Sequence, residues 1–491
     1  MTRPVSKNAP TTKTSFTTAI RQAAIDKVDL LFAIDNSASM GDKQEYLKLA
    51  VPDLVSRLLN PYCVNDQGVP IVEGGRAVTT SDGNCARGKA EFQPVQDMHI
   101  GIVTSSLGPR TGDVCDPNDK TPTGLDSHQD DRGHLINRAG DNEAPIPSMN
   151  PSNFLAWFPS VTKNQNKKPP TGAQAIVQAD ALANSFRDLV SGVHQLGCGV
   201  ESQLESWYRF LVQPDPYDTI GVSNNRAEWI GVDTTILKQR KDFLRPDSLV
   251  SVIVLTDEND SEIDVRSVGG NGYKFMSKQF KPPRGTSACD SDPNSSACTS
   301  CDLAGAAVKQ NDSSCQKGPY AADNDWGYDM NLRHVHAKQK YGIDPQFPIE
   351  RYLTGLTQRK VPDRQGEYPD PNAAYKGRHG QLHEPALRRS PPRRSDERGH
   401  ALQPALGSVH PRPRLYGIIG GVPYQLLHFD PNVPGSAQLN DADWVKVLGQ
   451  KSPAQVRLHG HRPAHGRVRS SRARTRSRHR SNPDPSTAAN G

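Results

Sequence analysis

The 491-residue sequence contains no run of about 20 consecutive apolar residues, the length that a membrane-spanning helix needs. A polytopic membrane protein is therefore excluded. The sequence also lacks a heptad pattern and any repeat of fixed period, so neither a coiled coil nor a solenoid is expected. Aromatic residues make up only 6% and apolar residues 34% of the chain, which is little material for several packed cores. We expect one sizeable globular domain, polar insertions and at least one disordered region.

Cysteine is absent after residue 315, but eight cysteines precede that point in loops rich in Gly, Asp, Asn and Ser. An even number in such loops favours disulfides and an oxidising compartment. Two alternatives are reduced cysteines in a cytosolic protein and a zinc site formed by Cys289, Cys298, Cys301 and Cys315. Residues 1–24 show no apolar core of a signal peptide, and a misassigned start would reconcile this with the cysteines.

Basic residues are concentrated in two segments. Residues 376–414 contain nine Lys or Arg and three acidic residues, and residues 451–491 contain ten Lys or Arg and one acidic residue. Because the whole chain has a net charge of only +6, the remainder is acidic. A nucleic-acid-binding role for the whole chain is therefore not expected.

Three interpretations of the basic segments stay open. They are disordered tails, a nucleic-acid-binding arm that lacks interleaved aromatic residues, or products of a shifted reading frame. We favour the third, because mixtures of Arg, Pro, His and Ser are typical of a GC-rich gene read one base out of frame. The resulting division is a polar leader at 1–24, a domain at 25–375, a basic low-complexity or frameshifted segment at 376–414, a late strand and helix of the same domain at 415–449, and a basic disordered or frameshifted tail at 450–491.

Nearly continuous apolar runs at 28–34, 98–104 and 249–256 indicate strands buried on both faces of a parallel sheet. A later strand is predicted at 415–419. Helical spacing predicts a helix that ends at Asn60 and is kinked or restarted at Pro52, others near 174–194 and 200–212, and a short one at 441–448. Polar insertions are expected at 61–96, 105–172 and 265–330. The alternation predicts an α/β fold with a doubly wound, mostly parallel sheet.

Polar side chains follow two of these strands directly. Asp35, Ser37 and Ser39 form a D-x-S-x-S motif after the first strand, and Asp257 follows the strand at 249–256. Ligands bind at the carboxyl ends of strands in such sheets. Hard oxygen donors suit Mg²⁺ or Mn²⁺, and neutral hydroxyls leave the cation able to attract a carboxylate. The alternative is a polar turn that caps the following helix without a metal.

The segments Val28–Met40 (VDLLFAIDNSASM) and Val252–Asp260 (VIVLTDEND) resemble the von Willebrand factor A-type domain family. The resemblance extends over about 26–375 and 415–449 and is closest to large, cysteine-containing secreted bacterial members, often lipoproteins. It implies a Rossmann-like domain with a metal-ion-dependent adhesion site for Mg²⁺, or Mn²⁺ or Ca²⁺. Ser37 and Ser39 would ligate the ion directly, and Asp35 and Asp257 directly or through water. The family's separate Thr ligand has no evident counterpart; Glu201 or Thr104 are candidates.

Together with the cysteines, this resemblance implies an extracytoplasmic location in the periplasm, in the outer membrane or outside the cell. It predicts a non-enzymatic binding module of the bacterial cell envelope that engages an acidic group of a protein partner. One alternative is a metal-assisted hydrolase, for which Glu258 is the base nearest in sequence. Another is a structural envelope protein with a vestigial site. No catalytic residue is assigned, and the sequence predicts no oligomeric state.

Resequencing of the gene across codons 370–455 tests the frame interpretation. We expect two or three frame slips, because the codons of 378–385 read as an ordinary protein segment when shifted by one base. An intact frame would leave the two basic segments as genuine parts of the chain.

Overall fold

The computed structural model describes residues 27–81, 83–245, 248–320, 334–358, 360–370, 375–376, 382–383 and 414–420. All of these belong to one of the chain's two units, and the second unit lies entirely outside them. The leader at 1–24, most of 376–414, the helix expected at 441–448 and the tail at 450–491 also lie outside the described residues. The interpretations of those segments stay predictions.

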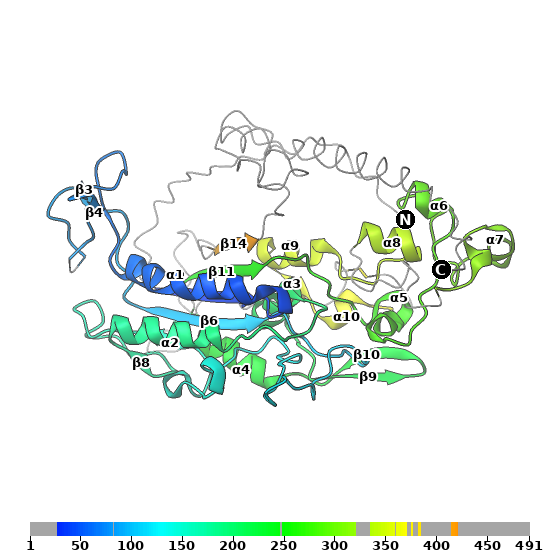
Figure 1. Ribbon diagram of the computed structural model, residues 1–491, viewed down its shortest axis with the longest axis horizontal. Coiled ribbons are helices and arrows are strands. Elements are labelled where there is room, and N and C mark those ends of the chain that lie inside the picture. Colours follow the sequence, from blue (N-terminus) through cyan, green and yellow to red (C-terminus); the bar gives the residue numbers. More distant parts are fainter. Residues whose placement is uncertain are drawn as a thin grey trace, which may run out of the picture. The chain divides into compact units, whose positions relative to one another are not determined.

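A six-stranded sheet forms the centre of the described part, in the order β14-β11-β1-β6-β7-β8 (Figure 1). Its pairs are parallel except β6 with β7, which is antiparallel. The chain first adds strands on one side of β1 and later returns to the other side, so the order reverses between β1 and β11. The predicted α/β fold with a mostly parallel sheet is confirmed. The strands are β1 Val28–Ile34, β6 Met98–Thr104, β7 Leu155–Trp157, β8 Ala175–Ile176, β11 Leu249–Thr256 and β14 Arg414–Gly420.

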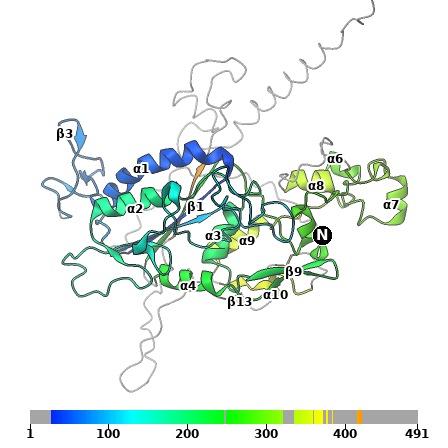
Figure 2. The same ribbon diagram turned by 60° about the horizontal axis from the view of Figure 1, so that its bottom comes forward.

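Every residue of β1 is buried, because helices cover both faces of the sheet. Leu30, Phe32 and Ile34 pack in a core with α1 and α2. Leu31 and Ala33 point to the opposite core, which contains side chains of α3 and α4. Figures 1 and 2 show α1 and α2 side by side along the sheet. These helices are α1 Gly41–Leu59, α2 Ala179–Ser191, α3 Gln203–Leu211 and α4 Thr234–Phe243.

Helix α1 continues through Pro52 as one element, so the predicted restart there is wrong. The expected insertion at 105–172 also contributes more than a loop, because its strand β7 extends the sheet as an antiparallel neighbour of β6. Only three residues long, β7 is too short for its periodicity to be recognised in the sequence.

The remaining elements are short and lie in the insertions, between β1 and α1, between α3 and α4, and after β11. The strands are β2 Cys63–Val64, β3 Val72–Glu73, β4 Arg76–Ala77, β5 Lys89–Ala90, β9 Thr219–Ser223, β10 Arg226–Ile230, β12 Val361–Pro362 and β13 Leu382–His383. The α-helices are α5 Ser267–Gly270, α6 Ala288–Ser291, α7 Ala306–Asn311, α8 Val335–Tyr341, α9 Ile349–Thr357 and α10 Arg364–Glu367. The 3₁₀ helices are η1 Ala38–Met40, η2 Gly140–Asn142, η3 Pro147–Met149, η4 Gly272–Met276 and η5 Cys315–Lys317.

All eight cysteines form disulfides. The pairs are Cys63–Cys85, Cys115–Cys198, Cys289–Cys298 and Cys301–Cys315. The alternative zinc site is therefore wrong, because its four thiols are joined in two disulfides. Four disulfides indicate an oxidising, extracytoplasmic environment. Among the described residues, no helix has the length and apolar character that crossing a membrane requires.

A buried ionic cluster joins α9 to α3 and α10. Arg351 is 2% exposed, contacts Glu205, and donates from Nε to Glu367 Oε1 at 2.6 Å. Its guanidinium also lies 3.8 Å from the centre of the Tyr208 ring. Removing such a cation leaves buried carboxylates without full compensation.

We expect Arg351→Met to lower the free energy of unfolding by about 3–5 kcal/mol, the usual loss when one partner of a buried ion pair is removed. Urea unfolding with the disulfides intact measures it. The control is Lys48→Met, which removes a partly exposed pair with Glu45 and should cost less than about 1 kcal/mol. Equal effects of the two variants would show that the buried cluster is not a stabilising element.

Candidate functional site

The D-x-S-x-S turn lies at the carboxyl ends of β1 and β11. Ile34 at the end of β1 is paired with Leu255 near the end of β11, so the two following segments leave the sheet side by side. The structure brings the predicted residues together: the Ser39 hydroxyl donates to Asp257 Oδ1 at 3.0 Å and lies 3.3 Å from the Ser37 hydroxyl. This is the point where the strand order reverses, the usual ligand position in doubly wound sheets.

Asp35 is fully buried, and its carboxylate accepts four hydrogen bonds. Oδ1 accepts from the Ser37 backbone N–H at 2.9 Å and from the Ser105 hydroxyl at 3.1 Å. Oδ2 accepts from the Thr256 hydroxyl at 2.8 Å and from Gln203 Nε2 at 3.1 Å. These four donors match the roughly four lone-pair positions of an ionised carboxylate. Asp35 therefore links the end of β1 with the segment after β6, the end of β11 and α3.

The capping alternative accounts for only part of this turn. The bond from the Ser37 N–H to Asp35 is the contact of an Asx turn. However, the Ser37 side chain makes no capping bond to η1, and the residue that precedes α1 is Met40, which cannot cap through its side chain. The Ser37 and Ser39 hydroxyls are thus oriented toward one another and toward Asp257 rather than toward helix N–H groups.

Two separations among the oxygen donors Ser37, Ser39 and Asp257 are close to those between the ligands of a small divalent cation. The two separations, Ser37 Oγ to Ser39 Oγ and Ser39 Oγ to Asp257 Oδ1, are 3.3 and 3.0 Å. Octahedral ligands at the distances typical of Mg²⁺ are about 3 Å apart. Ser37 is buried and Ser39 is exposed, so the donors reach from the sheet edge to the surface. Hydroxyl and carboxylate oxygens are the donors that hard cations such as Mg²⁺ or Mn²⁺ prefer.

Lys43, in the first turn of α1, is the cation next to these donors. Its ammonium group lies 3.4 Å from Asp257 Oδ2 and donates to the Ser39 carbonyl at 2.9 Å. Hydrogen bonding to Asp42, and also to Asp257, raises the pKa of Lys43 above its ordinary value, so its charge is retained. A divalent cation at the turn would therefore be repelled by Lys43.

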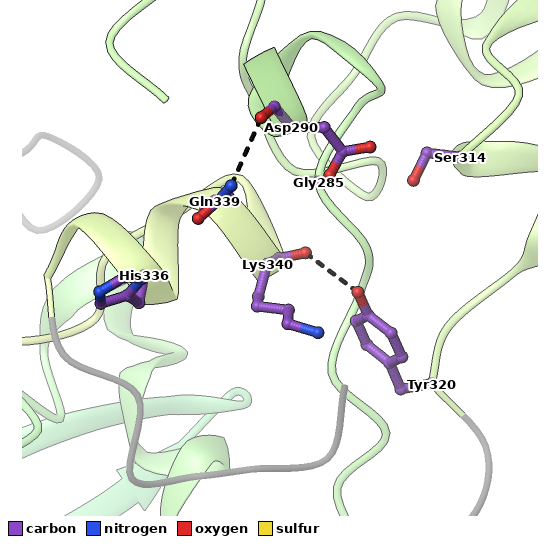
Figure 3. Close-up of a pocket in the computed structure, with 7 residues that line it drawn as sticks. All are labelled: Gly285, Asp290, Ser314, Tyr320, His336, Gln339 and Lys340. Carbon is purple, nitrogen blue, oxygen red and sulfur yellow. Dashed lines mark hydrogen bonds between the residues drawn. The ribbon is translucent and has the colours of Figure 1, made fainter. Parts of the chain in front are cut away.

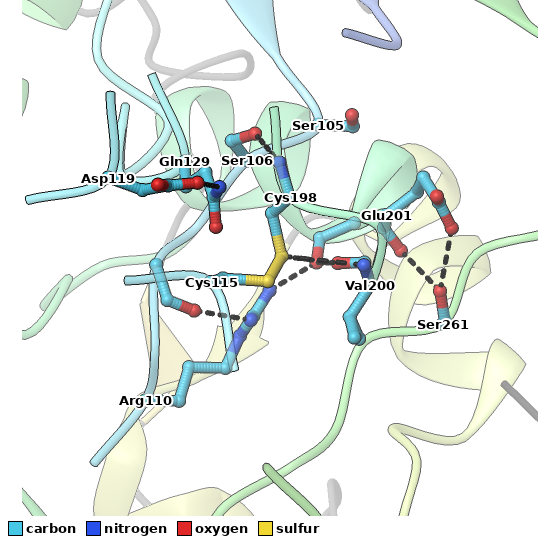
Figure 4. Close-up of a disulfide and its surroundings, with 12 residues drawn as sticks. Ser105, Ser106, Arg110, Cys115, Asp119, Gln129, Cys198, Val200, Glu201 and Ser261 are labelled. Carbon is cyan, nitrogen blue, oxygen red and sulfur yellow. Dashed lines mark hydrogen bonds between the residues drawn. A yellow bond between two sulfur atoms is a disulfide. The ribbon is translucent and has the colours of Figure 1, made fainter. Parts of the chain in front are cut away.

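A loop from 193 to 202 contacts the D-x-S-x-S turn. The Gly197 N–H donates to the Asn36 carbonyl at 2.8 Å, and a Cβ on Gly197 would lie 2.3 Å from the Asn36 side chain. Figure 4 shows how the Cys115–Cys198 disulfide joins this loop to the segment after β6, where the Ser106 hydroxyl accepts from the Cys198 N–H at 2.8 Å. The disulfide thus ties together two segments that contact the D-x-S-x-S turn.

The two candidates for a further metal ligand make contacts with other groups. The Thr104 hydroxyl donates to Asp131 Oδ2 at 2.6 Å. Glu201 Oε2 accepts from the Ser261 hydroxyl at 3.2 Å, as Figure 4 shows. Glu258, the base considered for a hydrolase, is exposed. The side chains that contact Asp35 are hydroxyls and an amide, which do not serve as proton acceptors at neutral pH.

Sequence reasoning missed Ser105, Thr256, Gln203 and Lys43 as parts of this site. Ser105 follows β6 directly and Thr256 ends β11. Their positions at the carboxyl ends of parallel strands could have indicated that they belong to the site. Gln203 lies on α3, and its approach to Asp35 depends on how that helix packs on the sheet. Lys43 is placed by the first turn of α1.

A concave region lies between the short helices α6 and α8 and the loops beside them (Figure 3). It encloses about 360 Å³ and is lined by Asp290, Tyr320, His336 and Lys340, among others. The two hydrogen bonds drawn in Figure 3 have backbone acceptors. Gln339 Nε2 donates to the Asp290 carbonyl, and the Tyr320 hydroxyl donates to the Lys340 carbonyl. These bonds join α6 and α8 to the loop that contains Tyr320, so the region is explained by packing of the insertion.

No protein-family model, curated protein or solved structure matches this chain. The function must therefore be inferred from the residues and their geometry.

We expect Asp35→Ala to lower the free energy of unfolding by about 1–3 kcal/mol, because the buried donors Ser105, Gln203 and Thr256 lose their shared acceptor. Ser39→Ala, at an exposed position, should change it by less than about 0.5 kcal/mol. Urea unfolding without added metal measures both. Equal stability of Asp35→Ala and the wild-type protein would show that Asp35 does not hold the sheet edge together.

Proposed function

We propose that this protein is an extracytoplasmic binding module of the von Willebrand factor A type that engages a carboxylate of a protein partner through a divalent cation. Ser37, Ser39 and Asp257 would hold the ion directly. Asp35 would act through water, because its oxygens already accept four hydrogen bonds. The observation that carries the proposal is the grouping of the Ser37, Ser39 and Asp257 oxygens at the switch point of the sheet.

The charge balance favours an acidic partner. Hydroxyl ligands are neutral, so Asp35 and Asp257 are the main anionic groups that this donor set offers to a doubly charged ion. The cation supplies a Lewis-acidic position that attracts a further oxygen anion. Ser39 lies at the surface, which gives a partner's Asp or Glu side chain access to this position.

Lys43 supports a second candidate, a structural envelope protein with a vestigial metal site. Its ammonium already neutralises Asp257 at 3.4 Å. The two candidates differ in whether a divalent cation displaces Lys43 from Asp257, and metal binding by variants distinguishes them. The hydrolase alternative is less well supported, because hydroxyl and amide side chains surround Asp35.

We expect Mg²⁺ or Mn²⁺ to bind the wild-type protein in calorimetry and the affinity to fall at least about tenfold in Ser39→Ala and Asp257→Asn, since each removes a direct ligand. Lys43→Gln should raise the affinity about three- to tenfold, because a like charge next to the ion is removed.

Lys48→Gln is the matched control, because Lys48 lies one turn further along α1 and pairs with Glu45. It should leave the affinity unchanged. Absence of binding in both the wild-type protein and Lys43→Gln would contradict the proposal and favour the structural role.

A further inference from the structure

A second cluster of metal-ligating side chains lies outside the D-x-S-x-S turn. His128, Glu143 and His194 come from three separate segments, and one ligand atom of each lies within 4.8 Å of the others. Glu143 Oε1 is 2.7 Å from His128 Nε2 and 3.2 Å from His194 Nε2. The three side chains are only 14–21% exposed, so the cluster is mostly shielded from water but still reaches the surface.

The two imidazole rings are arranged to present their nitrogens to the same carboxylate. They are nearly parallel, with an angle of 4° between them, and their centres are 5.7 Å apart. Each of the three residues also has a positive φ, at 53°, 51° and 57° for His128, Glu143 and His194. Non-glycine residues adopt this conformation rarely, and it is frequent at functional sites.

Further carboxylates surround His128. Its Nδ1 lies 3.9 Å from both Asp126 Oδ1 and Asp131 Oδ1, so the nitrogen that faces away from Glu143 has acidic neighbours. The Asp131 carboxylate also accepts hydrogen bonds from Arg138 Nη1 at 2.8 Å and from the Thr104 hydroxyl at 2.6 Å. These carboxylates lie beyond hydrogen-bond distance of the ring, and their negative charge favours a cation at the cluster.

We propose that His128, Glu143 and His194 form a binding site for a transition-metal ion of the Zn²⁺ class, distinct from the hard-cation site at Ser37 and Ser39. Two imidazoles and one carboxylate with an open fourth position are a common zinc ligand set. Tetrahedral ligands of zinc are about 3.3 Å apart, so the present separations of 2.7 to 4.8 Å need only side-chain adjustment.

The two sites are connected by hydrogen bonds from side-chain amides to backbone carbonyls. Asn36 Nδ2 donates to the His128 carbonyl at 3.3 Å, and Gln44 Nε2 donates to the carbonyls of both His194 and Asp35 at 2.8 Å. The zinc site is nevertheless independent of the proposed function, because it shares no ligand with the hard-cation site.

Titration of the full, disulfide-intact chain with Zn²⁺, and with Co²⁺ as a visible-absorption probe, tests this inference. Because the chain contains 15 histidines, the comparison between variants is decisive. We expect one equivalent of tight binding in the wild-type protein and an affinity at least about tenfold lower in Glu143→Gln and His194→Gln. His336→Gln, which changes an exposed histidine on α8, should bind as the wild type does.

Ser39→Ala should keep the Zn²⁺ affinity, so failure of the hard-cation site and failure of this one are distinguishable. Near-ultraviolet circular dichroism establishes that each variant is folded. Two histidine-to-glutamine changes and one isosteric Glu-to-Gln change are available, so a single unfolded variant does not prevent the test. Equal Zn²⁺ affinity and equal Co²⁺ spectra in the wild type and in the folded Glu143 or His194 variants would overturn the proposal and leave the cluster as a hydrogen-bonded strut.

Discussion

The hydrogen bonding of the Asp35 carboxylate is the constraint on which the arrangement of the site depends. A buried carboxylate is costly unless it is surrounded by donors. Here the donors come from the turn itself, from the segment after β6, from the end of β11 and from α3. Satisfying one charge therefore fixes four parts of the chain at the edge of the sheet. It also leaves the Ser37 hydroxyl beside the Ser39 hydroxyl, which donates to Asp257.

Disulfides stabilise the parts of the chain that have few apolar side chains to bury. The two cores on either side of the sheet account for most of the buried apolar side chains, whereas the insertions contain a smaller cluster around Phe275 and Tyr341. Cross-links stabilise such loop-rich regions by restricting the unfolded chain. The Cys115–Cys198 bond has an additional consequence, because it joins two segments that touch the D-x-S-x-S turn. The oxidising environment thus bears on the site as well as on stability.

Two clusters with different ligand chemistry are linked by side-chain hydrogen bonds to backbone carbonyls. The hydroxyl and carboxylate oxygens at Ser37, Ser39 and Asp257 suit hard cations, and the imidazoles of His128 and His194 suit borderline ones. The Asn36 and Gln44 amides bond the carbonyls of the histidines and so bring their segments against α1 and the turn. Lys43 already pairs with Asp257 in the first cluster, so a divalent cation must compete with its ammonium group for this carboxylate.

The sequence by itself determined the strands β1, β6 and β11, because continuous apolar runs bounded by polar turns have few other solutions. It also placed Asp35 and Asp257 at one sheet edge, since parallel strands end on the same side. Only the tertiary structure decided the cysteine pairing, the position of β7 and the approach of Gln203 and Lys43 to the turn. It alone united His128, Glu143 and His194, whose spacing of 15 and 51 residues follows no local pattern. Contacts of that kind depend on how loops fold back over the sheet, and no helical or strand periodicity encodes them.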